Sequence, residues 1–239
     1  MSDRVEHLIK EFYSDFRLRA DEVKQYANFI LALAKSNATG LAVEKEGGMQ
    51  VYEEFSLGRD LTKTIRASGY LLLYNLVEST LSNSIDTIHQ VIDDNDIEFE
   101  ELSENIQRIA LRNFKSIIDD PNHDPINSGH PIQLALVKLG YKREGLFSGN
   151  IDCRKIKDVS SRYGFYVPDP NSKGRKIGKH VLEIKNKRND LAHGALSFEA
   201  CGRDASPDHI VKITDDTIVY LRSVIRSISV YLRANAYRG

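Results

Sequence analysis

The chain has 239 residues, of which 41% are hydrophobic, and this is enough apolar material to bury a sizeable core. The formal net charge is −1, so no global basic field marks a nucleic-acid-binding protein, and any RNA contact must come from a local basic patch. No apolar run approaches the roughly 20 residues of a membrane span, and the charged N-terminus lacks the apolar segment of a signal peptide. We therefore expect a soluble cytoplasmic protein with Cys153 and Cys201 as free thiols.

Two long helices are predicted in the first hundred residues. Apolar residues recur at spacings of three and four over residues 3–34 and again over residues 60–93. Between these helices, residues 35–48 include the pair Gly47-Gly48, which predicts a loop. A short extended piece is expected near residues 49–55 because Val, Tyr and Phe there favour strands.

The middle of the chain is expected to alternate shorter helices with loops. A helix is predicted over residues 98–118, and residues 119–131 are rich in Asp, Pro, Asn, Gly and His, which is typical of a loop. Two short helices are predicted over about residues 131–139 and 152–163, the second with Asp152 as its N-cap. His123, Asp124 and His130 match no standard metal-site spacing, so no metal is expected.

The last part of the chain predicts a helix over residues 176–193, with Gly194 as a natural stop. A loop is expected over residues 197–208, followed by a closing helix over residues 215–236.

Consecutive helices without an interdomain linker, an internal repeat or a low-complexity tract predict one all-α domain. Its core would comprise roughly residues 1–95 and 175–239, with a helical and loop insertion over roughly residues 96–174.

Arg188 and His193 are the residues best suited to chemistry. On an ideal helix their side chains point about 140° apart. They meet at one site if the helix ends near His193, which Gly194 makes credible, or if a second copy of the chain supplies the partner group across a two-fold axis. Asn189 and Asp190 precede His193 by four and three residues, so either can hydrogen-bond the imidazole.

These residue types suit cleavage of an RNA phosphodiester by the RNA's own 2′-hydroxyl. A histidine can move a proton near neutral pH, and an arginine can hold the phosphate and stabilise the charge of the transition state. No metal is needed because the nucleophile belongs to the substrate, and DNA lacks that hydroxyl. The alternative is that Arg188 pairs with an acid on the surface and His193 caps a helix end.

The segment 186–194 resembles the R-x4-6-H motif of the HEPN superfamily, in the form R-N-D-x-x-H. Arg188 and His193 fill the two defining positions, and Asn189 fills the polar position after the arginine. Other stretches are similar to a bacterial subfamily of standalone HEPN-like nucleases, so the resemblance covers roughly residues 60–235: Gly69–Ser79, Ser148–Ile156, Leu196–Glu199 and Gly202-Arg203.

The resemblance implies a HEPN-type helical bundle that forms a two-fold homodimer through the motif-bearing helices. It also implies a metal-independent endoribonuclease that needs no cofactor and leaves a 2′,3′-cyclic phosphate. Such a protein would act as a toxin or antiviral defence effector, held silent by a cognate antitoxin or regulatory protein. Two alternatives are a non-catalytic module that binds RNA, a nucleotide or a partner, and a purely structural dimerisation subunit.

Further candidates lie outside the motif. Glu78 interrupts an apolar stretch, and it either orients Arg188 or His193 from a neighbouring helix or forms a structural salt bridge. Arg203, after the motif, is a candidate phosphate contact. Basic residues before the motif either track an RNA backbone or form a solvated helix face: Lys176, Lys179, Lys185 and Lys187. Arginines of the last helix are expected to be solvated or at a dimer rim: Arg222, Arg226 and Arg233.

Overall fold

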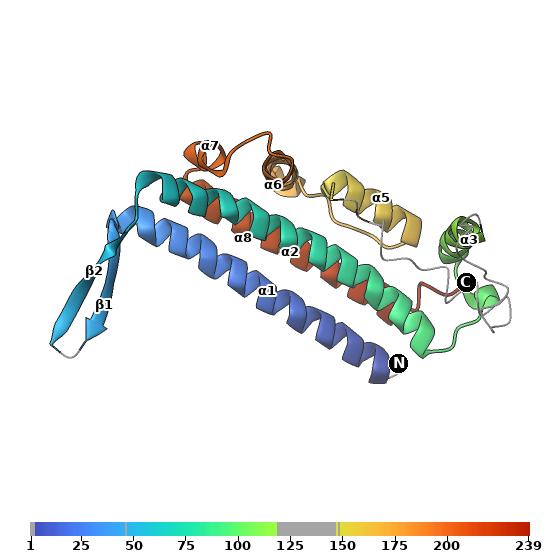
Figure 1. Ribbon diagram of the computed structural model, residues 1–239. Helices are drawn as coiled ribbons and strands as arrows, with labels where there is room; N and C mark the ends of the chain where they lie inside the picture. The colour runs from blue at the N-terminus through green and yellow to red at the C-terminus, as the bar shows by residue number, and fades with distance from the viewer. Residues whose placement is uncertain (1–2, 46, 119–146, 148) are drawn as a thin grey trace. The chain divides into compact units, whose positions relative to one another are not determined.

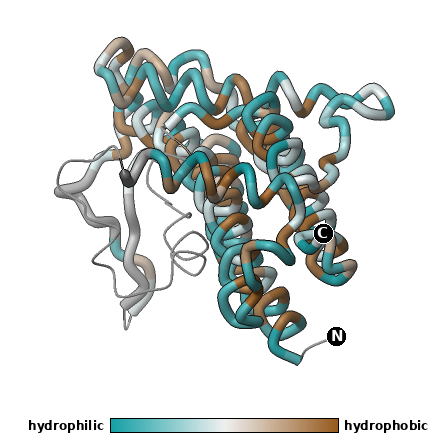
Figure 2. The backbone as a smooth tube through the Cα atoms, turned by 90° about the vertical axis from the view of Figure 1, so that its right-hand side faces the viewer, coloured by the Kyte–Doolittle hydropathy of each residue, from teal (hydrophilic) through white to brown (hydrophobic). Residues whose placement is uncertain are grey.

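The computed structural model describes residues 3–45, 47–118, 147 and 149–239. Within these ranges the regular secondary structure is helical apart from one β-hairpin, so the predicted all-α class is confirmed (Figure 1). Hydrophobic and hydrophilic residues alternate along each helix (Figure 2), as expected of helices that bury one face. The helices are α1 (Asp3–Ser36), α2 (Arg59–Asp94), α3 (Glu104–Ile118), α5 (Cys153–Tyr163), α6 (Ile177–Ala192), α7 (Phe198–Arg203) and α8 (Pro207–Arg233).

The chain divides into two compact units, and each is described by itself. The motif unit consists of Leu18–Leu76 and Lys176–Val219, and it contains α6 and α7. The terminal unit consists of Met1–Arg17, Val77–Arg175 and Tyr220–Gly239. Helices α1, α2 and α8 each contribute to both units. The expected organisation as one domain with an insertion stays a prediction.

In the motif unit, three long helices meet at Gly69. A Cβ atom built on Gly69 would lie 3.4 Å from Ile30 Cδ1 of α1 and 3.6 Å from Ile210 Cγ2 of α8. The Tyr26 hydroxyl of α1 donates to the carbonyl of Ile65 on α2 at 2.9 Å. A small residue therefore lets α2 approach both neighbours in this unit.

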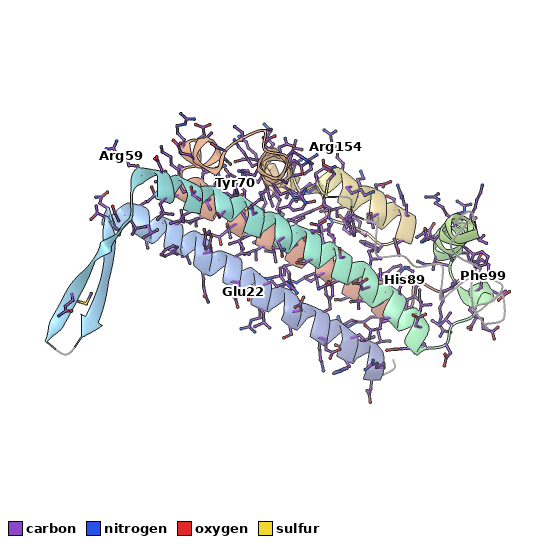
Figure 3. All side chains as sticks on the ribbon, viewed as in Figure 1. Glu22, Arg59, Tyr70, His89, Phe99 and Arg154 are labelled. Atoms are coloured by element: carbon purple, nitrogen blue, oxygen red, sulfur yellow. The ribbon has the colours of Figure 1, made fainter. Side chains whose placement is uncertain are left out.

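In the terminal unit, Tyr163 at the end of α5 is a centre of the core. Its hydroxyl shares a hydrogen bond of 2.9 Å with His89 Nε2 on α2 (His89 is labelled in Figure 3). Its carbonyl accepts from the Tyr231 hydroxyl at 2.9 Å. Burial lowers the pKa of His89 to about 3, so its imidazole is neutral at neutral pH. Asp152 caps α5 as predicted, because its Oδ1 accepts from the amides of Arg154 and Lys155.

The loop predicted over residues 35–48 is wrong. Helix α1 continues to Ser36, and β1 (Gly40–Lys45) pairs antiparallel with β2 (Gly48–Ser56), which confirms the extended piece over residues 49–55. Gly47 and Gly48 have φ of +110° and +116°, values that glycine adopts without strain, and Lys45 pairs with Gly48. The pairing between strands stabilises β1, and the local sequence carries little sign of it.

The predicted helix over residues 98–118 is interrupted. A 3₁₀ turn, Phe99–Glu101, precedes α3, and Leu102 between them is extended. The loop predicted over residues 197–208 is also wrong, because it contains α7 and the start of α8 at Pro207. Proline suits a first helical position, which explains the early start. The loop and helix expected over residues 119–139, with His123, Asp124 and His130, lie outside the described residues.

Candidate functional site

Arg188 occupies a core-facing position of α6. The buried residues of this helix recur at spacings of three and four, and position 188 continues the same row: Ile177, Val181, Ile184 and Leu191. The half-buried guanidinium lies over the Tyr74 ring of α2, 4.7 Å from its centroid. Arg188 Nη1 also donates to Asn189 Oδ1 at 3.0 Å. Placing a charge in an apolar row costs free energy unless the charge has a partner. The Tyr74 ring and the Asn189 amide oxygen are partners of the Arg188 guanidinium.

His193 stands where α6 ends. It is the C-cap residue, with φ −95° and ψ 3°, and its amide donates to the Asn189 carbonyl at 2.9 Å. Gly194 follows with φ +69°, and the Leu196 amide folds back onto the Asp190 carbonyl at 3.1 Å. The chain therefore leaves the helix directly after His193, and the imidazole is exposed.

The hydrogen bond expected from Asn189 or Asp190 to the imidazole is not formed in this chain. Asn189 Oδ1 accepts from Arg188 instead, and within the described ranges the His193 ring has no hydrogen-bond partner. His193 lies at the helix boundary, so the regular i,i+4 geometry that would bring the two side chains together no longer applies.

Glu183, just before the motif, anchors α6 to two other helices of the motif unit. Its Oε1 accepts from the Tyr70 hydroxyl of α2 at 2.8 Å (Tyr70 is labelled in Figure 3), and it pairs with His209 Nε2 of α8 at 2.9 Å. Burial, together with the hydrogen bond to Glu183, raises the pKa of Tyr70 far above its ordinary value. The position of the motif helix is thus set by a polar network.

A second buried polar contact lies beside this network. His180 Nδ1 of α6 is 2.9 Å from Asp216 Oδ2 of α8, in an ion-pair contact whose geometry does not make a hydrogen bond. The rings of His180 and His209 meet edge to face, with centroids 5.8 Å apart. Neither histidine was among the residues expected from the sequence, because their partners are distant along the chain.

The basic residues predicted to bind RNA do not share one face of α6. Lys176 and Lys179 are exposed at its start, whereas Lys185 and Lys187 are half-buried. Two residues turn a helix by about 200°, so Lys185 and Lys187 point to opposite sides. Arg203 is exposed at the end of α7.

Glu78 of α2 is half-buried and belongs to the terminal unit, whereas Arg188 and His193 belong to the motif unit. Its predicted role beside these two residues stays a prediction.

Helix α7, which sequence reasoning missed, docks directly on α2. A Cβ on Gly202 would lie 1.8 Å from the Lys63 carbonyl oxygen, so only glycine allows the two backbones to come this close. Lys63 Nζ also contacts Glu199 at 2.7 Å. The Ser197 hydroxyl caps the helix by accepting from the Ala200 amide, and a serine followed by an acidic first turn is a signal that can reveal such a helix.

The described part of the chain contains neither a cluster of metal-ligating side chains nor a membrane-spanning helix. No group of three or more His, Cys, Asp or Glu side chains there is arranged to hold a metal ion. None of its helices has an apolar stretch long enough to cross a bilayer.

A helical chain whose late helix ends in an Arg-Asn-Asp-x-x-His motif has the features of a HEPN-type protein. The model of the HEPN_MAE_28990-like HEPN family matches residues 8–237, so the chain belongs to this family and to the HEPN superfamily. The match includes most of α1, which the resemblance seen in the sequence did not cover. Searches of the curated proteins and of the solved structures found no match. Family membership indicates a nuclease or an RNA-binding module.

Proposed function

We propose that this protein is a metal-independent endoribonuclease that works as a homodimer. In this mechanism the guanidinium of Arg188 holds the scissile phosphate, and the imidazole of His193 moves the proton. Asn189 and Asp190 adjust the geometry of Arg188 and His193, and Glu78 orients these two residues. The RNA's 2′-hydroxyl attacks the phosphorus and the 5′-oxygen leaves, so the products are a 2′,3′-cyclic phosphate and a 5′-hydroxyl.

The observation that carries the proposal is the placement of Arg188. A purely structural helix would place an apolar residue at this position, because its neighbours in the row are buried. The charge is kept there and its guanidinium is oriented by Tyr74 and Asn189. Five residues further along, His193 is exposed at the helix end, where a substrate can reach it.

An arginine and a histidine can together carry out this reaction without a metal ion. An arginine stays charged at every physiological pH and forms two parallel hydrogen bonds to a phosphate. A histidine can give or accept a proton near neutral pH, which typically contributes 10²- to 10⁴-fold to a rate. The cations around the motif would add affinity for the RNA backbone: Lys176, Lys179, Lys185, Lys187 and Arg203.

The cleavage assay uses purified protein and a labelled single-stranded RNA in excess EDTA. Wild type is expected to cleave, and Arg188→Ala and His193→Ala are expected to lose at least about 10²-fold in rate. The matched controls are Arg59→Ala and His7→Ala, an exposed arginine and an exposed histidine outside the motif. An RNA with a single 2′-deoxy substitution should resist cleavage at that nucleotide. Loss of cleavage in EDTA, or cleavage by His193→Ala at the wild-type rate, would overturn the mechanism. RNA binding without new termini would establish the non-catalytic module instead.

The composite site is tested by mixing two inactive variants. If the arginine of one protomer works with the histidine of its partner, a heterodimer of Arg188→Ala and His193→Ala contains one intact site. Random exchange then restores about one quarter of wild-type activity. If each site uses both residues of one chain, the mixture stays inactive.

The proposed biological role is that of a toxin or antiviral defence effector controlled by a cognate regulatory protein. Expression of the wild type should slow the growth of host cells, and Arg188→Ala should relieve this. Equal growth inhibition by the two proteins would contradict a toxic ribonuclease activity.

A further inference from the structure

A groove in the terminal unit lies between the faces of α1 and α8, outside the motif unit. Its volume is about 600 Å³, which is in the range of ligand pockets. It is lined by one row of residues from each helix. The row from α1 is Glu6, Ile9, Lys10, Tyr13, Ser14 and Arg17, and the row from α8 is Arg226, Ser229, Val230 and Arg233. We call this the α1/α8 groove.

The groove is basic in a chain that is slightly acidic. Four cations, Lys10, Arg17, Arg226 and Arg233, face one carboxylate, Glu6, which gives a local charge of 4 − 1 = +3. The whole chain carries −1. Positive charge concentrated in a concave surface attracts anions more strongly than the same charge spread over the protein.

The single carboxylate is already neutralised. Arg233 donates two hydrogen bonds to Glu6, from Nη2 to Oε1 at 2.8 Å and from Nε to Oε2 at 3.1 Å. The Arg233 guanidinium accordingly lowers the pKa of Glu6. Lys10, Arg17 and Arg226 are exposed, and none of them is within ion-pair distance of a carboxylate in the described ranges. Lys10 adds only a smaller electrostatic attraction to Glu6, so the three cations remain available to a ligand.

The arrangement of the cations along the α1/α8 groove suits an extended anion. Lys10 and Arg17 are seven residues apart on α1, which is about 10 Å along the helix axis. Successive phosphates of a nucleic-acid strand in a duplex advance by about 3.4 Å, so this length accommodates more than one phosphate. A single small anion would use only part of the groove.

The groove also offers an apolar surface beside the charges. Tyr13 is half-buried between Lys10 and Arg17, and Val230 is 64% exposed on the opposite wall. Alternation of cations with an aromatic ring is the pattern of surfaces that bind a single strand, where the ring stacks on a base.

We propose that the α1/α8 groove binds single-stranded RNA, with Lys10, Arg17 and Arg226 on the phosphates and Tyr13 stacked on a base. The groove is separate from the Arg188–His193 motif, and its role is binding, so the proposal holds whether or not the chain cleaves RNA. It revises the expectation for Arg226, which the sequence placed among solvated or dimer-rim charges.

The test measures binding of a fluorescein-labelled, 2′-O-methylated single-stranded RNA of on the order of ten nucleotides to the full chain by fluorescence anisotropy. This RNA has no free 2′-hydroxyl, so it binds without being cleaved. The groove variant is Lys10→Ala/Arg17→Ala/Arg226→Ala. The control is Arg112→Ala/Lys115→Ala/Arg154→Ala, which removes three exposed cations of the same unit from α3 and α5 (Arg154 is labelled in Figure 3).

The groove variant is expected to raise the Kd at least about tenfold and to make the slope of log K against log salt shallower by about 2, because three phosphate contacts are lost. The control should stay within about threefold of wild type. Tyr13→Ala should weaken binding about fivefold or more, and Tyr13→Phe should bind as wild type does.

Thermal melting of every variant checks that the fold is intact. Equal Kd values for the groove variant and the control variant would overturn the proposal. A groove variant that binds RNA normally but changes the oligomeric state in sedimentation would also overturn it, and would assign the groove to contact between copies of the chain.

Discussion

The guanidinium of Arg188 lies over the ring of Tyr74, with its central carbon 4.7 Å from the ring centroid. Both residues belong to the motif unit, and Tyr74 is only 2% exposed. A buried ring on α2 therefore fixes the direction of a charged group on α6. In a site where the arginine must meet a phosphate, that direction matters as much as the charge itself.

Tyr74→Leu is expected to lower the cleavage rate about threefold to thirtyfold, because the cation–π contact that orients Arg188 is lost. Tyr74→Phe keeps the aromatic face and should retain most of the activity. The loss should appear chiefly in kcat, since the arginine is still present but misoriented. Single-turnover cleavage, measured well below the melting temperature of each variant, separates this effect from loss of stability. Wild-type kcat in Tyr74→Leu would show that the ring does not position Arg188.

The contact between Tyr70 and Glu183 is expected to couple the stability of α2 and α6. Tyr70→Phe and Glu183→Gln should each lower the free energy of unfolding by about 1–3 kcal/mol, because each leaves a charged or buried polar group with a weaker partner. The double variant should lose less than the sum, by about 1 kcal/mol. Urea unfolding of the four proteins measures this coupling, and strict additivity would mean that the 2.8 Å hydrogen bond contributes nothing.

Gly202→Ala is expected to loosen α7. The added Cβ would lie 1.8 Å from the Lys63 carbonyl oxygen, and a backbone atom cannot swing away as the end of a side chain can. We expect a loss of about 1–3 kcal/mol in the free energy of unfolding. The control is Gly58→Ala in the same unit, where a Cβ meets nothing within 4 Å, and which should change stability by less than about 0.5 kcal/mol. Equal stability of the two variants would contradict the close approach of α7 and α2.

His89 predicts a pH dependence of stability in the acid range. Burial lowers its pKa from 6.5 to about 3, so below pH 6.5 the unfolded chain binds a proton that the folded chain does not. The stability that neutral His89 contributes is therefore complete above about pH 6.5 and is lost as the pH falls toward 3. His89→Gln should reduce the stability difference between pH 7 and pH 5 by on the order of 1–2 kcal/mol.

The matched control for this titration is His7→Gln, because His7 is exposed on α1 of the same unit. Urea unfolding at pH 5, 6 and 7 gives the two pH profiles. A His89→Gln profile that runs parallel to the wild-type profile would show that His89 is not held neutral.

Features that depend on residues near one another in the chain were predictable. The three- and four-residue spacing of apolar side chains predicted α1 and α2 almost to their ends. Asp152 marked the start of α5, and Gly194 marked the end of α6. The motif of Arg188 and His193 was also visible, because a helix end and its capping residues are encoded locally.

Other features arise only when distant segments pack together. No local pattern shows that Tyr74 lies beneath Arg188 or that Gly202 must fit against Lys63. Nor does any local pattern show that β1 pairs with β2. The same holds for the α1/α8 groove, because its cations on α1 lie more than two hundred residues before its cations on α8 in the chain. Spacing along a helix tells which face a residue is on, whereas the neighbour it meets there depends on the packing of the whole unit.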